Sequence, residues 1–125
     1  MHEISTKHSD TWIEEGVIHK KIFQSRFEVS DIISEYLAER ELSVDDCSVI
    51  IDARNGYKLS PEARSYALQV YRQHAAVGIV INSFLLRSVY NYILKSQNIG
   101  NIRFFNSFRD AMKWLSKRPS GAVSA

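Results

Sequence analysis

Two short apolar runs, each stopping at a polar junction, constrain this fold more than any other feature of the sequence. Cys47–Ile51 stops at Asp52, and Ala75–Ile81, which is rich in β-branched residues, stops at Asn82. Apolar runs of this length are typical of strands covered on both faces, as in parallel sheets. Each run leads into a segment with helical spacing. The sequence therefore predicts parallel strands joined by crossover helices.

The residues before the first run predict a β-hairpin followed by a helix. Thr11–Glu14 and Val17–Phe23 are rich in β-forming residues and flank the turn dipeptide Glu15-Gly16. From Val29 to about Glu41, apolar residues recur at the i, i+3, i+4, i+7 and i+8 positions of an amphipathic helix.

Polar starts mark three further helices. Ser60-Pro61-Glu62 combines a capping hydroxyl, a proline suited to the first helical position and an acidic group at the positive end of the helix dipole. Asn82-Ser83 and Asn106-Ser107 open the other two helices, and the strand Ile102–Phe105 lies between them. In the helix after Ser83, Leu86, Val89, Tyr90, Ile93 and Leu94 repeat with helical spacing, and Tyr90 is expected in the core.

These elements predict one α/β domain with a mixed, mostly parallel sheet of about five strands, an N-terminal β-hairpin and about four helices. We expect a flexible start over residues 1–10, the domain over 11–117 and a disordered tail over 118–125. Lys20 and Lys21 in the hairpin are expected to form a charged sheet edge that discourages pairing with another sheet.

Composition narrows the function classes. The 16 basic and 14 acidic residues give a net charge of +2, and no stretch concentrates basic residues as a nucleic-acid-binding arm would. Cys47 is the only cysteine, which excludes an internal disulfide and favours a reducing, cytoplasmic location. The first residues do not resemble a secretory signal. The longest stretch without Asp, Glu, Lys or Arg, Gln73–Leu86, is too short to span a membrane.

Recognisable catalytic motifs are missing. The four histidines, His2, His8, His19 and His74, have no metal-binding spacing, and no GxSxG, SxxK or glycine-rich phosphate loop occurs. We therefore predict no metal, no cofactor and no enzymatic activity. An enzyme with Asp52 as acid or base and Arg54 as electrostatic support remains an alternative.

The strand-to-helix junctions form the best candidate site. Ligands of open α/β sheets bind beyond the carboxyl ends of the strands, where helix N-termini can also hold anions. Serines there are also explained as helix N-caps, a purely structural role. The candidate binding residues, which we call the rim, are Asp52, Arg54, Asn55, Ser60, Arg64, Asn82, Ser83, Arg87 and Asn106.

The segment from Val49 to Asn55, the run Ser60-Pro61-Glu62-Ala63-Arg64 and the later Ile81-Asn82-Ser83, with Arg87 and Asn91, resemble small standalone bacterial STAS domains. STAS denotes the fold of sulfate transporters and anti-sigma-factor antagonists, also called SpoIIAA-like. The chain looks closest to an uncharacterised branch described as STAS/SEC14-like. The resemblance implies a regulatory module that binds a protein partner, a small anionic ligand or a second copy of itself.

Two further expectations come from the resemblance. Anti-sigma-factor antagonists carry a phosphorylated serine in an Asp-Ser-Ser-Gly-Leu-like motif, whereas here Ser60 most nearly aligns with that Asp and Pro61 with the phosphoacceptor. Phosphorylation control is therefore not expected, and a structural cap is preferred for Ser60. The SEC14-like branch implies an alternative function, the carriage of a small apolar or lipid ligand.

Overall fold

A six-stranded sheet forms the centre of the computed structural model, which describes residues 3–23, 25–42 and 47–117. In spatial order its strands are β1 (Glu3–Ser5), β2 (Ser9–Glu14), β3 (Val17–Ile22), β5 (Ser48–Asp52), β7 (Val77–Val80) and β8 (Ile102–Phe105). β2 is antiparallel to both of its neighbours, and β3, β5, β7 and β8 are mutually parallel. The predicted mixed, mostly parallel sheet is confirmed.

The predicted hairpin forms from β2 and β3, in the register Glu14↔Val17. Glu15 and Gly16 both have positive φ angles, of 53° and 77°, which suits a tight turn that matches the twist of the strands. The prediction of a flexible start is wrong for Glu3–Ser5. These residues add a sixth strand because β1 pairs with β2 in the register Ile4↔Thr11. The predicted tail over 118–125 lies outside the described residues.

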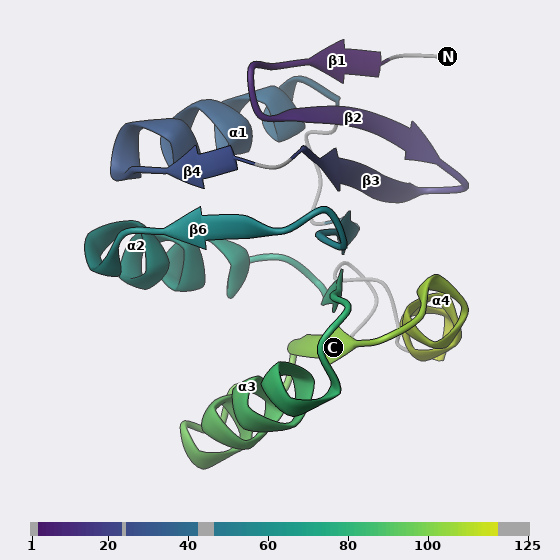
Figure 1. Cartoon of the computed structure of the whole chain (residues 1–125). Helices are drawn as coiled ribbons and strands as arrows, with labels where there is room; N and C mark the ends of the chain where they lie inside the picture. Colours follow the sequence, from purple (N-terminus) through teal and green to yellow (C-terminus); the bar gives the residue numbers. More distant parts are fainter. Residues whose placement is uncertain (1–2, 24, 43–46, 118–125) are drawn as a thin grey trace.

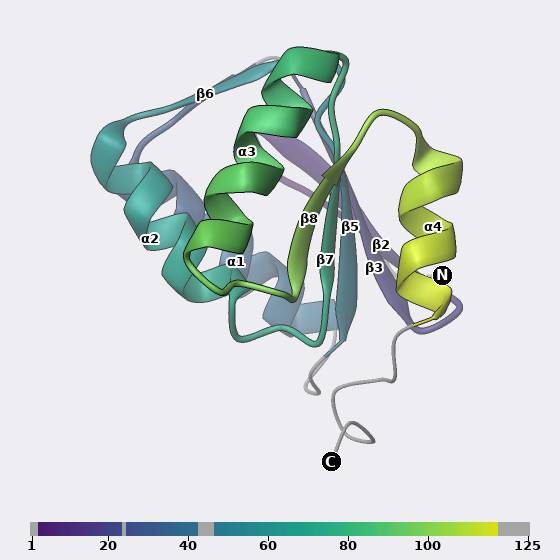
Figure 2. The ribbon, with the colours of Figure 1, turned by 90° about the horizontal axis from the view of Figure 1, so that it is seen from below.

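Helices cover both faces of the sheet unequally (Figures 1 and 2). α1 (Val29–Leu42), α2 (Pro61–Tyr71) and α3 (Phe84–Ser96) lie on one face, and α4 (Phe108–Ser116) lies on the other. The chain steps from β3 to β5, β7 and β8 in one direction, so right-handed crossovers place the first three helices on the same side.

Successive side chains of each strand point to opposite faces of the sheet, and each face has its own apolar core. Val49 and Ile51 belong to the larger core, under α1, α2 and α3, while Ile50 belongs to the smaller one under α4. α4 packs closely on β7, since an added Cβ at Gly78 would lie 3.5 Å from the Ala111 Cβ, an ordinary contact distance.

A short parallel ribbon adds a strap outside the main sheet. β4 (Ser25–Phe27) pairs with β6 (Tyr57–Leu59), and the pair lies beside the ends of α1 and α2 (Figure 1). The side chains of Phe27, Tyr57 and Leu59 pack on the larger core.

Asn91 of α3 closes the outer edge of β8. Its amide group donates a hydrogen bond to the Phe104 carbonyl oxygen at 2.9 Å and accepts one from the Phe104 N–H at 2.8 Å. One side chain thus occupies a donor and an acceptor that an edge strand would otherwise offer to another chain.

Candidate functional site

The rim is organised by a paired carboxylate and guanidinium at the end of β5. Arg54 Nε and Nη2 donate to the two oxygens of Asp52 at 2.9 and 2.8 Å. Hydrogen bonds from the Arg54 side chain lower the pKa of Asp52, although partial burial acts in the opposite direction. Asp52 is therefore ionised and already paired at neutral pH, whereas an acid–base catalyst needs a pKa near the working pH.

Two rim asparagines bind backbone groups of neighbouring loops. Asn82 Nδ2 donates to the Arg54 carbonyl oxygen at 2.8 Å, and Asn106 Nδ2 donates to the Ile81 carbonyl oxygen at 3.1 Å. These bonds bring the ends of β5, β7 and β8 together, as the sequence predicted for this edge. Asn55 is exposed in the turn that follows Asp52.

The serines of the rim are helix N-caps. Ser60 Oγ accepts from the Ala63 N–H and Ser83 Oγ accepts from the Leu86 N–H, both at 3.1 Å. Ser107 caps α4 in the same way. The capping role predicted from sequence is confirmed, and each cap contributes about 1 kcal/mol of stability.

The two remaining rim arginines lie on separate helices. Arg64 is exposed on α2. Arg87 is half-buried on α3, with its Cζ 5.9 Å from the centre of the Phe84 ring. The structure therefore gathers Asp52, Arg54, Asn82 and Asn106 into one linked set, while no hydrogen bond or ion pair joins Arg64 or Arg87 to that set within the described residues.

Large apolar side chains beside the rim are exposed on α3. Phe84, Leu85 and Tyr92 are 72%, 73% and 74% exposed. Of the apolar repeat that predicted this helix, only Leu94 is buried and Tyr90 is half-buried. α3 covers β8, the last strand of the sheet, so only a narrow side of the helix packs on the rest of the protein. We call the exposed set the α3 face: Phe84, Leu85, Leu86, Val89, Tyr92 and Ile93.

A buried ionic cluster lies on the same side of the sheet, between the strands and α1 and α2. Lys20 Nζ lies 2.6 Å from Glu35 Oε1 and 3.1 Å from Glu39 Oε2, and all three side chains are buried. The Tyr71 hydroxyl donates to Glu39 Oε2 at 2.7 Å, and His74 Nε2 lies 3.4 Å from Glu39 Oε1. We call these five residues the Lys20 cluster.

The Lys20 cluster corrects the interpretation of Lys20 as part of a charged edge. β3 is an interior strand, and Lys20 points into the helix-covered face while Lys21 is exposed. The signal was present in the strand period, because Ile18, Lys20 and Ile22 share one face. On α1, Glu35 and Glu39 are four residues apart and therefore lie on the same side of the helix. Both are buried, whereas the apolar Ile33 and Leu37 are exposed.

An apolar cavity of about 90 Å³ adjoins the cluster. Lys20, Glu35 and Tyr71 form its polar wall, and the other lining residues are Ile22, Phe27, Ile32, Ile51, Tyr57, Leu59, Ala67 and Ile79. Typical ligand pockets measure roughly 300–1,000 Å³. As it stands, the cavity has room for a small apolar group and not for a whole metabolite.

Two further features are absent from the described part of the chain. No group of three or more His, Cys, Asp or Glu side chains there is placed to hold a metal ion. None of the helices there is long and apolar enough to cross a membrane.

Comparison with known proteins identifies the fold. A model of the family described as "Domain of unknown function (DUF7793)" matches residues 11–118. No curated protein matches the sequence. Among solved structures, an uncharacterised protein from the DUF3478 family of Shewanella loihica PV-4, with a SpoIIAA-like fold, matches with a TM-score of 0.62 and 17% sequence identity. The match covers 90% of this chain and 98% of that one. This chain therefore has a SpoIIAA-like fold, as the STAS-like resemblance predicted.

Proposed function

Because the chain belongs to the DUF7793 family, whose function is unknown, we propose a function from its own surface. It is a non-enzymatic, STAS-like binding module that engages a protein partner through the α3 face and the adjoining rim. The observation that carries this proposal is the exposure of Phe84, Leu85 and Tyr92 to 72%, 73% and 74% on one helix, with the exposed Val89 on the turn between Leu85 and Tyr92.

Such a surface is typical of an interface. Single exposed apolar residues are common, but a contiguous patch of large ones beside polar groups marks a binding surface. A few residues carry most of the binding energy in protein interfaces, Tyr is enriched among them, and both Phe and Tyr are enriched in interface cores. Phe84 and Tyr92 are suited to that role, and the polar groups around Asn82 supply a rim of the kind that surrounds interface cores.

Between the two ligands predicted for the rim, a protein partner fits better than a small anion. A small anion needs cations that converge on one point, yet Arg54 is paired with Asp52, and Arg64 and Arg87 lie on two separate helices. A protein can instead bury apolar area while leaving this pair at the periphery of the contact.

The test is affinity purification of the tagged chain from its native host, with quantitative mass spectrometry of the bound proteins. Leu85→Ser with Tyr92→Ser should lose a protein that the wild type retains, and so should Arg54→Ala with Arg87→Ala. Lys58→Ser, an exposed change on β6, is the matched control and should retain it. Identical recovery by all variants would contradict the proposal.

The apolar cavity supports a second candidate, a carrier of a small apolar ligand. Its volume of about 90 Å³ admits a short alkyl or ring fragment, and a lipid would require β4 and β6 to move away from α1 and α2. Native mass spectrometry of freshly purified protein tests this candidate. A co-purified apolar molecule that Ala67→Phe displaces would support it, and an unloaded chain would count against it.

A further inference from the structure

The segment of the chain that contains α3 carries charge of a single sign. No aspartate or glutamate occurs between Glu62 and Asp110, a stretch that contains all of β7, α3 and β8 and most of α2. The basic residues in this stretch are Arg64, Arg72, Arg87, Lys95, Arg103 and Arg109. The near-neutral net charge of the whole chain conceals this asymmetry, because the acidic residues lie in the parts before and after it.

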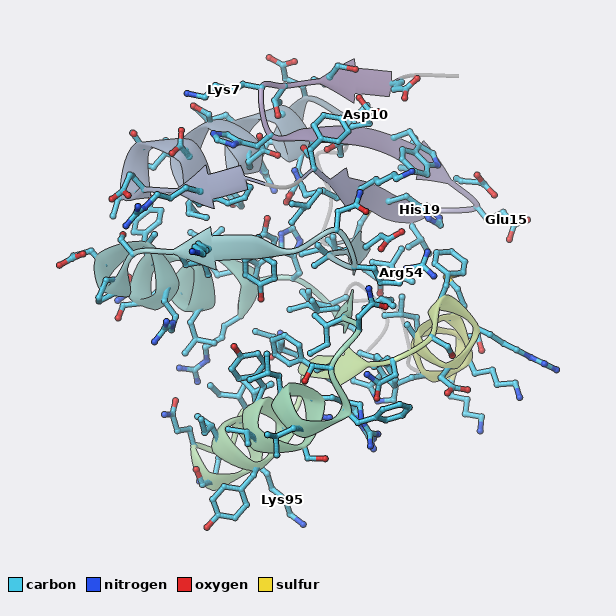
Figure 3. All side chains as sticks on the ribbon, in the orientation of Figure 1. Lys7, Asp10, Glu15, His19, Arg54 and Lys95 are labelled. Atoms are coloured by element: carbon cyan, nitrogen blue, oxygen red, sulfur yellow. The ribbon has the colours of Figure 1, made fainter. Side chains whose placement is uncertain are left out.

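Cations flank the α3 face on two sides. Lys95 is exposed in the last turn of α3 and points away from the sheet (Figure 3). Arg64 is exposed on α2, the helix that lies next to α3 on the same face of the sheet (Figure 2). The lysine and arginine ion pairs of the described residues involve Lys20, Arg26 and Arg54. Lys95 and Arg64 thus keep their charge available to a partner.

The spacing of the apolar side chains indicates the shape of that partner. Leu85, Val89 and Tyr92 follow one another at i, i+4 and i+7, so they form a ridge along the exposed side of the helix. Ridges of this kind pack into the grooves of another helix. A helix of this length, about 20 Å, offers three to four turns of contact.

We propose that the docking segment of the partner is an acidic amphipathic helix. This inference rests on the proposed function and adds the chemistry of the partner to it. Apolar residues of the segment pack on Leu85, Val89 and Tyr92, and carboxylates on its flanks face Lys95 and Arg64. Complementary charge of this kind raises the association rate and disfavours partners of the same sign.

Two other occupants fit the same surface less well. A second copy packed through the same face would bring another α3, which has no carboxylate to pair with Lys95. Helices that bind membrane surfaces have polar faces rich in Lys and Arg, whereas α3 contributes only Arg87 and Lys95, and Arg87 is half-buried.

The test uses two synthetic helical peptides of about 18 residues with the same leucine stripe, one with glutamates and one with lysines on its flanks. In fluorescence anisotropy, the acidic peptide should bind the intact chain at least about tenfold more tightly, and its affinity should fall as NaCl rises. Lys95→Glu should weaken binding of the acidic peptide. Lys113→Glu, the same change on α4, is the matched control and should leave binding unchanged.

Other results would overturn the inference. One is equal affinity of the chain for both peptides. A second is co-sedimentation of the chain with vesicles of phosphatidylcholine and phosphatidylglycerol in the absence of peptide. A third is a dimer of the chain in sedimentation velocity that Leu85→Ser converts to monomer. A photocrosslinking residue in place of Tyr92, used in the native host, distinguishes failure of this inference from failure of the proposed function. A crosslinked partner segment without acidic flanks would overturn the inference alone, and a chain without any protein adduct in its native host would overturn both.

Discussion

The Lys20 ammonium lies 2.6 Å from Glu35 Oε1 in the interior of the protein, where only 2% and 3% of the two side chains are exposed. The pair joins β3 to α1, and the hydroxyls of Thr6 and Ser9 donate further hydrogen bonds to Glu35. Burial of charges is costly unless they are paired and hydrogen-bonded, and here both conditions are met. Removal of Lys20 or Glu35 should therefore lower the stability of the fold far more than removal of the exposed neighbour Lys21.

Lys20→Met is expected to lower the free energy of unfolding by about 3–5 kcal/mol, because it leaves Glu35 and Glu39 buried without their counter-charge. The matched control is Lys21→Met on the same strand, which should change stability by less than about 0.5 kcal/mol. Urea unfolding followed by circular dichroism at neutral pH measures both. Similar small effects for the two variants would show that the pair does not stabilise the fold.

Glu35 should make the fold sensitive to acid. Burial acts to raise the pKa of Glu35, but the Lys20 charge and the hydrogen bonds from Lys20, Ser9 and Thr6 outweigh it, so the pKa lies below its ordinary 4.5. Because the folded-state pKa is depressed, the contribution is present above pH 4.5 and is lost as the pH falls through the folded value. In Glu35→Gln, the free energy of unfolding measured by urea titration should fall less steeply as the pH is lowered below 4.5. The exposed change Glu41→Gln should leave that fall as steep as in the wild type.

Two tyrosines should make the fold sensitive to alkali. Burial raises the pKa of Tyr57 to about 12, and burial together with the Glu39 carboxylate raises the pKa of Tyr71 well above its ordinary value. Since the folded-state pKa values are raised, the stability they contribute is present below the ordinary pKa of 10.0 and is lost as the pH rises. Phenolate absorbance should keep rising above about pH 11, and Tyr57→Phe should remove part of that late rise. A titration that is complete at lower pH would contradict the burial of both hydroxyls.

The exposed part of α3 should tolerate polar substitution. Leu85→Ser and Tyr92→Ser are expected to change the free energy of unfolding by less than about 0.5 kcal/mol each, since most of each side chain is already in water. Leu94→Ala, on the buried side of the same helix, should cost about 2–5 kcal/mol. Thermal unfolding compares the three variants. Large losses at Leu85 or Tyr92 would mean that these residues serve the core and not a partner.

Local sequence signals predicted most of the fold. The apolar runs, the Glu15-Gly16 turn and the Ser60, Ser83 and Ser107 caps depend on residues close together in the chain, and the structure confirms them. The strand Glu3–Ser5 was missed because a three-residue edge strand forms only through its pairing with β2.

The rotation of each helix was harder to predict than its existence. Apolar spacing at Leu86, Val89 and Ile93 predicted a helix, but the side that a helix buries depends on which strands lie under it. α3 covers the last strand of the sheet, so part of its apolar surface has no cover. In α1, the pairing of Glu35 and Glu39 with Lys20 outweighed the apolar pattern, and this contact joins residues far apart in sequence.

The amide of Asn91 acts as a rotational lock on α3. Asn91 is hydrogen-bonded to both the N–H and the carbonyl oxygen of Phe104, so rotation of the helix by one residue would break both bonds at once. That same rotation would carry Leu85 and Tyr92 away from their outward positions. The Asn91 side chain thus contributes both to the closed edge of the sheet and to the orientation of the α3 face, so a change at Asn91 should disturb both together.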